Sequence, residues 1–443
     1  MQFPEKGISQ EEVASRLNDA ISHDADWRGG KIFSLVYFAG DDVADVLKEA
    51  YTTAFYTNGL GPGAFKSLKK FESEVISMTG DLLNCPEAAG NMTSGGTESI
   101  LMAVKTARDW ARAHKGIDRP QIIVPVTAHP AFDKAAHYLD VDIVRTPLRD
   151  DLRTDVDAMR GAITQDTVLL AGSAPCYPFG VIDPIAEIAG LAAERGLLCH
   201  VDACLGAYLL PFTERLAYAV TPWDFRVPGV TSISADLHKY GYSARGASVV
   251  LYRVRDLRRH QFFAVSDWPG GLYGSPTLAG SRPGGAIAAA WAVLNFLGTE
   301  GYTRLARVIM DTTAALIEGI NDIPQLEVLG KPEMSVFAFA SDSFDIYAVA
   351  DALAEAGWHP DRQQRPPSLH CMVTPVHEKI VDRFLPDLRR ATEYVAQNGA
   401  VSTGRAATYG MLDKMPDRAA VRNVVLDSMD RLTGAKRDPA ARD

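Results

Sequence analysis

Apolar and polar residues follow two different periods along the chain. Residues 64–83 and 96–114 carry apolar side chains at three- and four-residue intervals, which predicts amphipathic helices. Short apolar runs rich in β-branched residues predict buried strands at residues 121–126, 141–145, 167–173, 197–201, 230–234 and 247–252. Because strands and helices alternate, the pattern predicts an α/β fold with a mostly parallel sheet and helices on both faces.

The pattern changes after a long apolar helix expected at residues 285–316. Short strands and helices then alternate irregularly, which predicts a smaller α+β domain: strands near 325–330, 336–341 and 368–376, and helices near 344–356 and 377–397. We expect an N-terminal segment (1–55), a large domain (56–300), a small C-terminal domain (301–432) and a polar, disordered tail (433–443).

Composition excludes several classes of function. A formal net charge of -10 over 443 residues offers no basic surface for nucleic acid. Five scattered cysteines without CxxC spacing indicate neither a disulfide framework nor a metal site, and they suit a reducing cytoplasm. The most apolar stretch, residues 285–298, is too short to span a bilayer, and the N-terminus lacks an apolar signal core. We therefore expect a soluble cytoplasmic protein without a transmembrane segment.

A lysine stands where open α/β sheets usually present groups to a ligand. The apolar run at 230–234 predicts a buried strand, and His238 and Lys239 follow its end. Ligands of such sheets bind beyond the carboxyl ends of the strands. Lys239 is therefore a candidate for chemistry, although most lysines are only solvated charges.

The stretch Ser94-Gly95-Gly96-Thr97 stands at the start of the second predicted helix. The glycines let the backbone approach an anion closely, while the hydroxyls and the free N–H groups of the helix start supply donors. This stretch therefore predicts an anion-binding cup. A simple capped turn explains the same residues equally well when they are taken alone.

Asp202 follows the apolar run at 197–201, so we expect it to project from the end of a buried strand. An unpaired carboxylate in that position is costly, and a cationic partner is needed. An arginine, a helix N-terminus or a protonated ring nitrogen would serve. For an isolated buried aspartate, structural pairing is the commoner explanation.

These three features together are the parts that pyridoxal 5′-phosphate (PLP) requires. The cup would hold the phosphate, Asp202 would keep the pyridine nitrogen protonated, and Lys239 would bind the cofactor covalently through its amine. His129 lies just after the strand predicted at 121–126 and is expected to stack on the cofactor ring. A lone histidine is more often structural, so only the combination supports this role.

Four stretches are similar to the sphingosine-1-phosphate lyases, a family of PLP-dependent enzymes of fold type I related to the group II decarboxylases: residues 93–109, 200–212, 235–253 and 274–285. The similarity extends from about Lys31 to Ala396. It implies the fold-type I architecture with PLP bound in the large domain.

The resemblance also implies a homodimer with shared active sites. In the family, the stretch that begins here with Gly274 and Ser275 completes the phosphate cup of the other chain, and His238 contacts the cofactor phosphate. The membrane-anchoring helix of the eukaryotic members is not found in this sequence, so the resemblance implies a soluble, prokaryotic form.

Four further residues match family positions around the substrate's phosphate or amine: Tyr37, Asn58, Tyr177 and Arg245. Arg245 stands where the family usually has lysine, which preserves the charge and adds a bidentate fork. The family histidine expected at Gly61 is missing, which would widen the pocket or weaken its hold on phosphate. A positive φ at this glycine would be another reason for its presence.

The resemblance implies cleavage of the C2–C3 bond of a phosphorylated sphingoid base, giving phosphoethanolamine and a fatty aldehyde. A base must remove the proton of the C3 hydroxyl. Lys239 and the cofactor phosphate are candidates for that base and Tyr177 a candidate helper, while Asp202 and His129 complete the predicted catalytic set. Two alternatives remain open: an amino-acid decarboxylase, which the missing histidine at Gly61 favours, and a catalytically silent binding protein, which the cofactor residues argue against.

Overall fold

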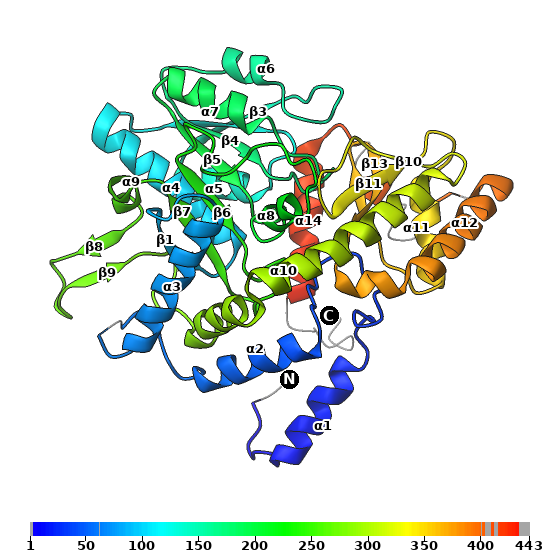
Figure 1. Cartoon of the computed structure of the whole chain (residues 1–443), viewed down its shortest axis with the longest axis horizontal. Helices are drawn as coiled ribbons and strands as arrows, with labels where there is room; N and C mark the ends of the chain where they lie inside the picture. The colour runs from blue at the N-terminus through cyan, green and yellow to red at the C-terminus, as the bar shows by residue number, and fades with distance from the viewer. Residues whose placement is uncertain (1–2, 62, 400, 404–408, 412–414, 434–443) are drawn as a thin grey trace, which may run out of the picture.

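A seven-stranded sheet with the order β1-β7-β6-β5-β4-β2-β3 forms the centre of the large domain (Figure 1). This computed structural model describes residues 3–61, 63–399, 401–403, 409–411 and 415–433. The strands are β1 (Ala89–Thr93), β2 (Gln121–Pro125), β3 (Asp142–Thr146), β4 (Thr167–Ser173), β5 (Leu198–Asp202), β6 (Ser232–Ala235) and β7 (Ser248–Tyr252). The six strands expected from the apolar runs are confirmed, while β1, a short run of mixed polarity, was not predicted.

The sheet is mostly parallel, as the alternation of strands and helices predicts. β7 pairs antiparallel with both β1 and β6, and the other pairs in the sheet are parallel. β1, β4, β5 and β6 therefore point the same way, and their carboxyl ends meet at one edge. That edge is where an open α/β sheet binds its ligands.

Both faces of the sheet are buried at its inner strands, which is why β2, β4 and β7 read as nearly continuous apolar runs. Ile122 and Val124 belong to one apolar core and Ile123 to another, because successive side chains of a strand point to opposite faces. The helices around the sheet are α3 (Lys66–Leu82), α4 (Gly96–Lys115), α5 (Ala131–Leu139), α6 (Val156–Gly161), α7 (Ile185–Glu194), α8 (Leu210–Arg215) and α9 (Arg255–Arg259). The predicted helices at 64–83 and 96–114 correspond to α3 and α4.

A second, antiparallel sheet with the order β10-β11-β13-β12 lies at the other end of the molecule (Figure 1). Its strands are β10 (Glu327–Val328), β11 (Val336–Ala340), β12 (Asp361–Gln364) and β13 (Pro367–Met372). The helical elements beside it are α11 (Ile346–Glu355), η1 (Pro375–Lys379) and α12 (Val381–Asn398). β12 was not predicted because its sequence is entirely polar.

The helix α10 (Gly284–Asn321) connects the two sheets and bends at Gly298, where φ is 53°. The sequence predicted a shorter helix at 285–316, and the predicted domain boundary at residue 300 falls just after this bend. The division into domains stays a prediction. The last ten residues of the predicted tail lie outside the described residues, while Thr433 ends α14 (Arg418–Thr433).

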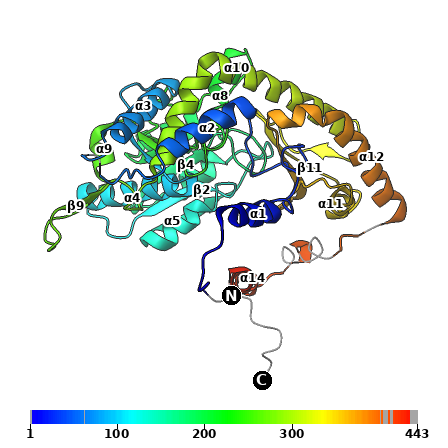
Figure 2. The same cartoon turned by 90° about the horizontal axis from the view of Figure 1, so that it is seen from below.

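Two peripheral elements extend from the body. α1 (Gln10–Ile21) has no buried residue, and the hairpin of β8 (Phe263–Val265) and β9 (Tyr273–Ser275) projects beyond the central sheet (Figure 1). α2 (Asp41–Thr53) instead packs along α10 (Figure 2).

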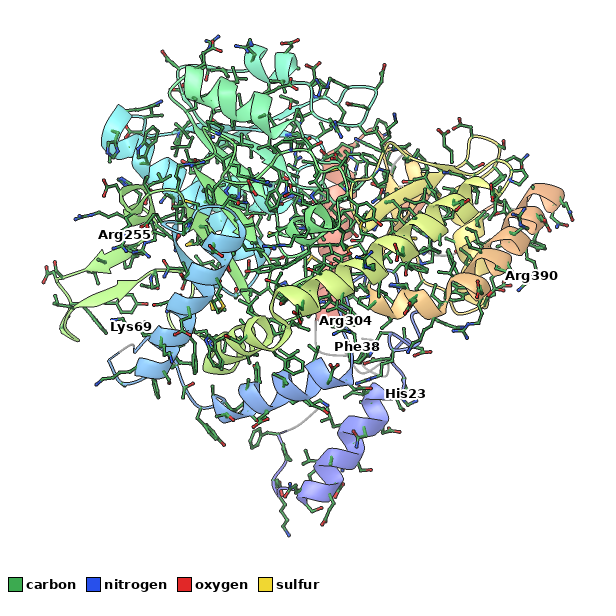
Figure 3. All side chains as sticks on the ribbon, in the orientation of Figure 1. His23, Phe38, Lys69, Arg255, Arg304 and Arg390 are labelled. Carbon is green, nitrogen blue, oxygen red and sulfur yellow. The ribbon has the colours of Figure 1, made fainter. Side chains whose placement is uncertain are left out.

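Exposed basic side chains are spread over separate elements, as Lys69, Arg255, Arg304 and Arg390 illustrate (Figure 3). Within the described residues, no helix combines the length and the apolar character needed to cross a membrane.

Candidate active site

A cavity of about 500 Å³ opens at the carboxyl edge of the central sheet. It is lined by Ser173 at the end of β4, Asp202 at the end of β5, and the loop that carries Lys239 after β6. The start of α4 forms another wall. The structure thus brings the lysine, the aspartate and the cup together, although they are far apart in the sequence.

Lys239 forms an ion pair at the floor of this cavity. Its Nζ lies 3.1 Å from Oδ2 of Asp236, whose side chain is almost fully buried. Burial alone would lower the pKa of Lys239, but the carboxylate of Asp236, followed by Cys204 and Asp202, raises it above its usual value. The same ion pair, assisted by His238, lowers the pKa of Asp236 against the opposing effect of burial. Without a ligand, Lys239 is therefore held as an ammonium by a fixed partner.

Asp236 was missed by sequence reasoning. The argument that identified Asp202, a carboxylate just after a buried strand, applies equally to Asp236, which directly follows β6. Its Oδ1 is buried without a hydrogen-bond partner among the described residues. Asp236 therefore anchors the reactive lysine and retains one free acceptor atom.

Asp202 is buried and has no cation within ion-pair distance among the described residues, unlike the buried Asp224, which pairs with Arg226. Its Oδ1 accepts hydrogen bonds from the N–H of Cys204 at 3.1 Å and from Oγ of Ser234 at 3.3 Å. The cationic partner that a buried carboxylate needs must therefore come from a ligand in the cavity.

The cup at the start of α4 is built as an anion site. Gly95 and Gly96 begin the helix, whose first N–H groups have no acceptor within it. A Cβ at Gly96 would lie 2.7 Å from Sγ of Cys204 and 2.8 Å from Oδ2 of Asp236, so only glycine fits there. Thr97 stands at the rim of the cavity with its side chain exposed.

Ser94 is engaged within the protein. Its N–H and its hydroxyl both donate to Oε2 of Glu98 at 2.6 Å. The other carboxylate oxygen of Glu98 accepts the N–H of Leu278 at 2.9 Å. Glu98, a second residue that sequence reasoning did not single out, thus ties the cup to the loop that follows the β8–β9 hairpin.

A chain of hydroxyls holds the cup against the strand that leads to Lys239. Oγ1 of Thr93 lies 2.6 Å from Oγ of Ser99, which lies 2.8 Å from Oγ of Ser248. Ser248 in turn donates to the carbonyl of Ala235 at 3.0 Å. β1, α4, β6 and β7 are thereby fixed relative to one another around the site.

Two histidines face the cavity. His238 lies beside the cup, because a Cβ at Gly95 would come within 3.3 Å of its Cε1, and its Nδ1 is buried without a partner among the described residues. The Nδ1 of His129 accepts the N–H of Ala131 at 3.1 Å, which fixes the orientation of the ring. Burial lowers the pKa of both histidines, against the opposing effect of nearby aspartates, so both rings are neutral at pH 7.

Three of the four predicted substrate residues line the cavity: Tyr37, Tyr177 and Arg245. Tyr177 donates to Oδ2 of Asp361 at 3.1 Å, and burial, followed by this carboxylate, raises its pKa. The guanidinium of Arg245 lies 5.6 Å from the centre of the Tyr37 ring, and the structure gives it no ion-pair partner among the described residues. An exposed and unpaired guanidinium is available to an anion.

The other predicted residues lie outside this chain's cavity. Asn58 accepts the N–H groups of Leu60 and Arg282 and so connects two loops. Gly61 has no positive φ, and a Cβ there would meet only Cδ2 of Phe65, at 3.9 Å, so the backbone does not require glycine at this position.

Gly274 and Ser275 lie on β9 and are likewise not part of the cavity lining. The hydroxyl of Ser275 donates to the carbonyls of Thr277 and Ala279 of its own chain, at 3.0 and 3.2 Å. If these two residues complete a cup, it belongs to another copy of the chain.

The residues present fit PLP. Asp202 lacks the cation that a pyridine nitrogen would supply, and the free Nδ1 of His238 stands beside a cup that can hold a phosphate. Lys239 supplies the amine that binds the cofactor's aldehyde carbon. The ring nitrogen, the aldehyde and the phosphate of the cofactor thus each have a complementary group in the cavity.

Comparison with known proteins agrees with this geometry. Residues 3–341 match the pyridoxal-dependent decarboxylase conserved domain. A glutamate decarboxylase of Lactobacillus brevis, 19% identical, has the same fold with a TM-score of 0.78 over 90% of this chain and 96% of that one. The chain therefore belongs to the pyridoxal-dependent decarboxylase family, with fold type I and PLP as its cofactor.

Two more similar proteins narrow the assignment. A sphingosine-1-phosphate lyase of Oryza sativa subsp. japonica is 45% identical, over 97% of this chain and 81% of that protein. The solved structure of a Burkholderia pseudomallei sphingosine-1-phosphate lyase is 40% identical, with a TM-score of 0.90 over 98% of this chain and 97% of that one. The chain belongs to the sphingosine-1-phosphate lyases.

Proposed function

We propose that this chain cleaves the C2–C3 bond of phosphorylated sphingoid long-chain bases to phosphoethanolamine and a fatty aldehyde. The observation that carries the proposal is one cavity in which Lys239, Asp202 and the cup meet, with Arg245, which has no ion-pair partner among the described residues, at its rim. Relatives at 38–45% identity are named as lyases acting on such a substrate. The decarboxylase alternative rests on the missing histidine at Gly61, and the Lactobacillus brevis glutamate decarboxylase shares the fold at only 19% identity.

Each residue of the site has a role in this proposal. When bound, PLP supplies an electron sink beside the substrate's amine nitrogen. Asp202 holds a proton on the pyridine nitrogen, His129 packs against the ring, and the N–H groups of the cup together with His238 hold the phosphate. These roles rest on the positions of the side chains around the cavity.

With PLP and substrate bound, Nζ of Lys239 would be free as a neutral amine and would take the proton of the C3 hydroxyl, and Asp236 would stabilise the ammonium that forms. As the C2–C3 bond breaks, C3 leaves as the aldehyde carbon and C2 takes up a proton. The raised pKa of Tyr177 keeps its phenol protonated at neutral pH, and its hydroxyl would turn from Oδ2 of Asp361 to donate to the substrate. Arg245 binds the substrate's phosphate through its guanidinium fork.

The active form in this proposal is a cytoplasmic homodimer. Gly274 and Ser275 of one copy would complete the cup of the other, which their position outside their own cavity supports. The hairpin that carries them exposes Phe263, Trp268 and Leu272, which suits burial against a second copy. The five cysteines are free and buried, as suits a reducing compartment.

The test is product analysis on the purified, PLP-loaded chain. Incubation with a phosphorylated long-chain base should give phosphoethanolamine and aldehyde in equal amounts, and a panel of amino acids should release no carbon dioxide. Borohydride reduction should fix the cofactor to Lys239, as mapped by mass spectrometry. Carbon dioxide and amine as products would replace the lyase assignment with a decarboxylase, and an adduct on another lysine would contradict the site.

A further inference from the structure

The cavity has a buried floor and an exposed rim. Among the described residues that line it, the exposed ones are Leu35, Ser94, Thr97, His129 and Arg245. Four of them are polar. Leu35 is the only apolar member of the rim, and 71% of its surface is exposed.

The backbone at Leu35 is strained. Its φ is +65°, and across it the N–H of Val36 donates to the carbonyl of Ser34 at 2.7 Å. A three-residue turn with a positive φ at a branched residue is rare and unfavourable. Residues held in this way cluster at ligand sites, where the surrounding structure fixes them.

The neighbouring Phe33 holds the turn in place. Its ring is buried and stacks on His377 with the ring centres 4.8 Å apart. Its carbonyl accepts the N–H of Met372 at 2.7 Å, so the turn is bonded to the end of β13. The strained leucine is thus presented to solvent by a rigid support.

Apolar surface continues from Leu35 into the cavity. Met372, buried, and Tyr37, half-buried, both line it, with the hydroxyl of Tyr37 3.3 Å from Sδ of Met372. Of the polar members of the rim, Ser94 is bonded to Glu98, and Thr97, His129 and Arg245 have roles toward the cofactor or the phosphate in the proposed function. This leaves one apolar exit from the site.

We propose that Leu35 contacts the alkyl chain of the substrate and sets the enzyme's preference for chain length. The inference rests on the proposed function, because it requires a substrate with a phosphate at one end and a long alkyl group beyond C3. Arg245 takes the phosphate, and the alkyl chain leaves the cavity over Leu35. An exposed leucine that covers part of this chain gains free energy from the apolar area it removes from water.

The experiment compares two phosphorylated bases that differ only in alkyl length, both kept below their critical micelle concentrations. In the PLP-loaded, unaltered chain, kcat/KM should be higher for the longer base. Leu35→Gly should lower this ratio of long to short about tenfold, through KM of the longer base, which corresponds to about 1.4 kcal/mol. Leu35→Asn should also lower the ratio, and Leu35→Met should keep the ratio of the unaltered chain.

The Leu35→Gly and Leu35→Asn variants should fold, because glycine and asparagine both tolerate a positive φ. Leu152, a leucine with φ of +64° that does not line the cavity, gives the matched control, and Leu152→Gly should leave the ratio unchanged. An unchanged ratio in Leu35→Gly, or an equal drop in Leu152→Gly, would overturn the role of Leu35. If the unaltered chain cleaves neither base, the proposed function itself is wrong.

Discussion

At the level of single residues, the site depends on carboxylates that are buried for different reasons. Asp224 is paired with an arginine, Asp236 with the reactive lysine, and Asp202 with no cation among the described residues. A buried charge without a partner is expensive to maintain, so its place in the fold indicates a ligand. Replacing the carboxylate with a neutral amide should therefore have a different effect at each of the three aspartates.

We predict that Asp202→Asn lowers kcat at least about a hundredfold, or about 3 kcal/mol of transition-state stabilisation, and largely spares cofactor binding. Asparagine keeps an oxygen that can accept from Cys204 and Ser234, but it cannot hold a proton on the ring nitrogen as a carboxylate does. Steady-state kinetics and the absorbance of bound PLP measure the two effects. The matched control is Asp224→Asn, which should reduce stability and retain kcat, whereas near-normal kcat in Asp202→Asn would make its carboxylate merely structural.

At the level of elements, buried histidines join strands and loops in their neutral form. His200 on β5 lies between the hydroxyls of Ser232 and Ser234 on β6, at 2.9 and 3.2 Å. Nε2 of His377 in η1 lies 3.0 Å from the carbonyl of Ile32. Burial lowers the pKa of both histidines to about 4. Each therefore couples the stability of its element to pH.

We predict that the free energy of unfolding falls as the pH drops from about 6.5 to about 4. In this range the unfolded chain, whose histidines titrate near 6.5, binds more protons than the folded chain, so acid favours unfolding. Each histidine contributes a slope of up to about 1.4 kcal/mol per pH unit, and the loss is complete below about pH 4.

Urea unfolding at a series of pH values measures this slope for the unaltered chain and for His200→Asn. The variant should be less stable at pH 7. Its free energy of unfolding should change less with pH, by the slope that one histidine contributes. An identical slope in the two proteins would show that His200 is not kept neutral by burial.

At the level of the whole molecule, the β8–β9 hairpin projects beyond the central sheet and exposes apolar side chains (Figure 1). Leu272 is 86% exposed and Trp268 54% exposed, which is costly for a monomer. The loop after the hairpin is bonded to Glu98 beneath the cup. Burial of the hairpin against a second copy would therefore couple dimer formation to cofactor binding.

We predict that Leu272→Asp shifts the proposed dimer toward monomer and weakens PLP binding at least tenfold, because a charge would have to be buried in the proposed interface. Sedimentation velocity and PLP titration measure the two effects. Tyr394→Asp replaces an exposed aromatic residue on α12, at the far end of the molecule, and should change neither. If the Leu272→Asp variant stays dimeric and binds PLP with normal affinity, the hairpin is not part of a shared site.

The sequence by itself determined six of the seven strands of the central sheet and the identity of the cofactor. Strands buried on both faces, such as β2, β4 and β7, are mostly apolar and were readable as runs, and chemistry beyond the ends of β5 and β6 pointed to Asp202 and Lys239. Strands that are not apolar, such as the polar β12, could not be predicted from the sequence. β12 is a strand because it pairs with β13, and its own residues do not indicate one.

Only the tertiary structure decided which side chains meet. The pairing of Asp236 with Lys239, the bonds of Glu98 to Ser94 and Leu278, and the exposed turn at Leu35 depend on distances between segments that sequence spacing does not encode. Local pattern determines whether a residue is buried in a strand or helix. The packing of those elements determines which side chain the residue contacts. At this site the packing pairs Lys239 with Asp236 and leaves Asp202 without a cation among the described residues.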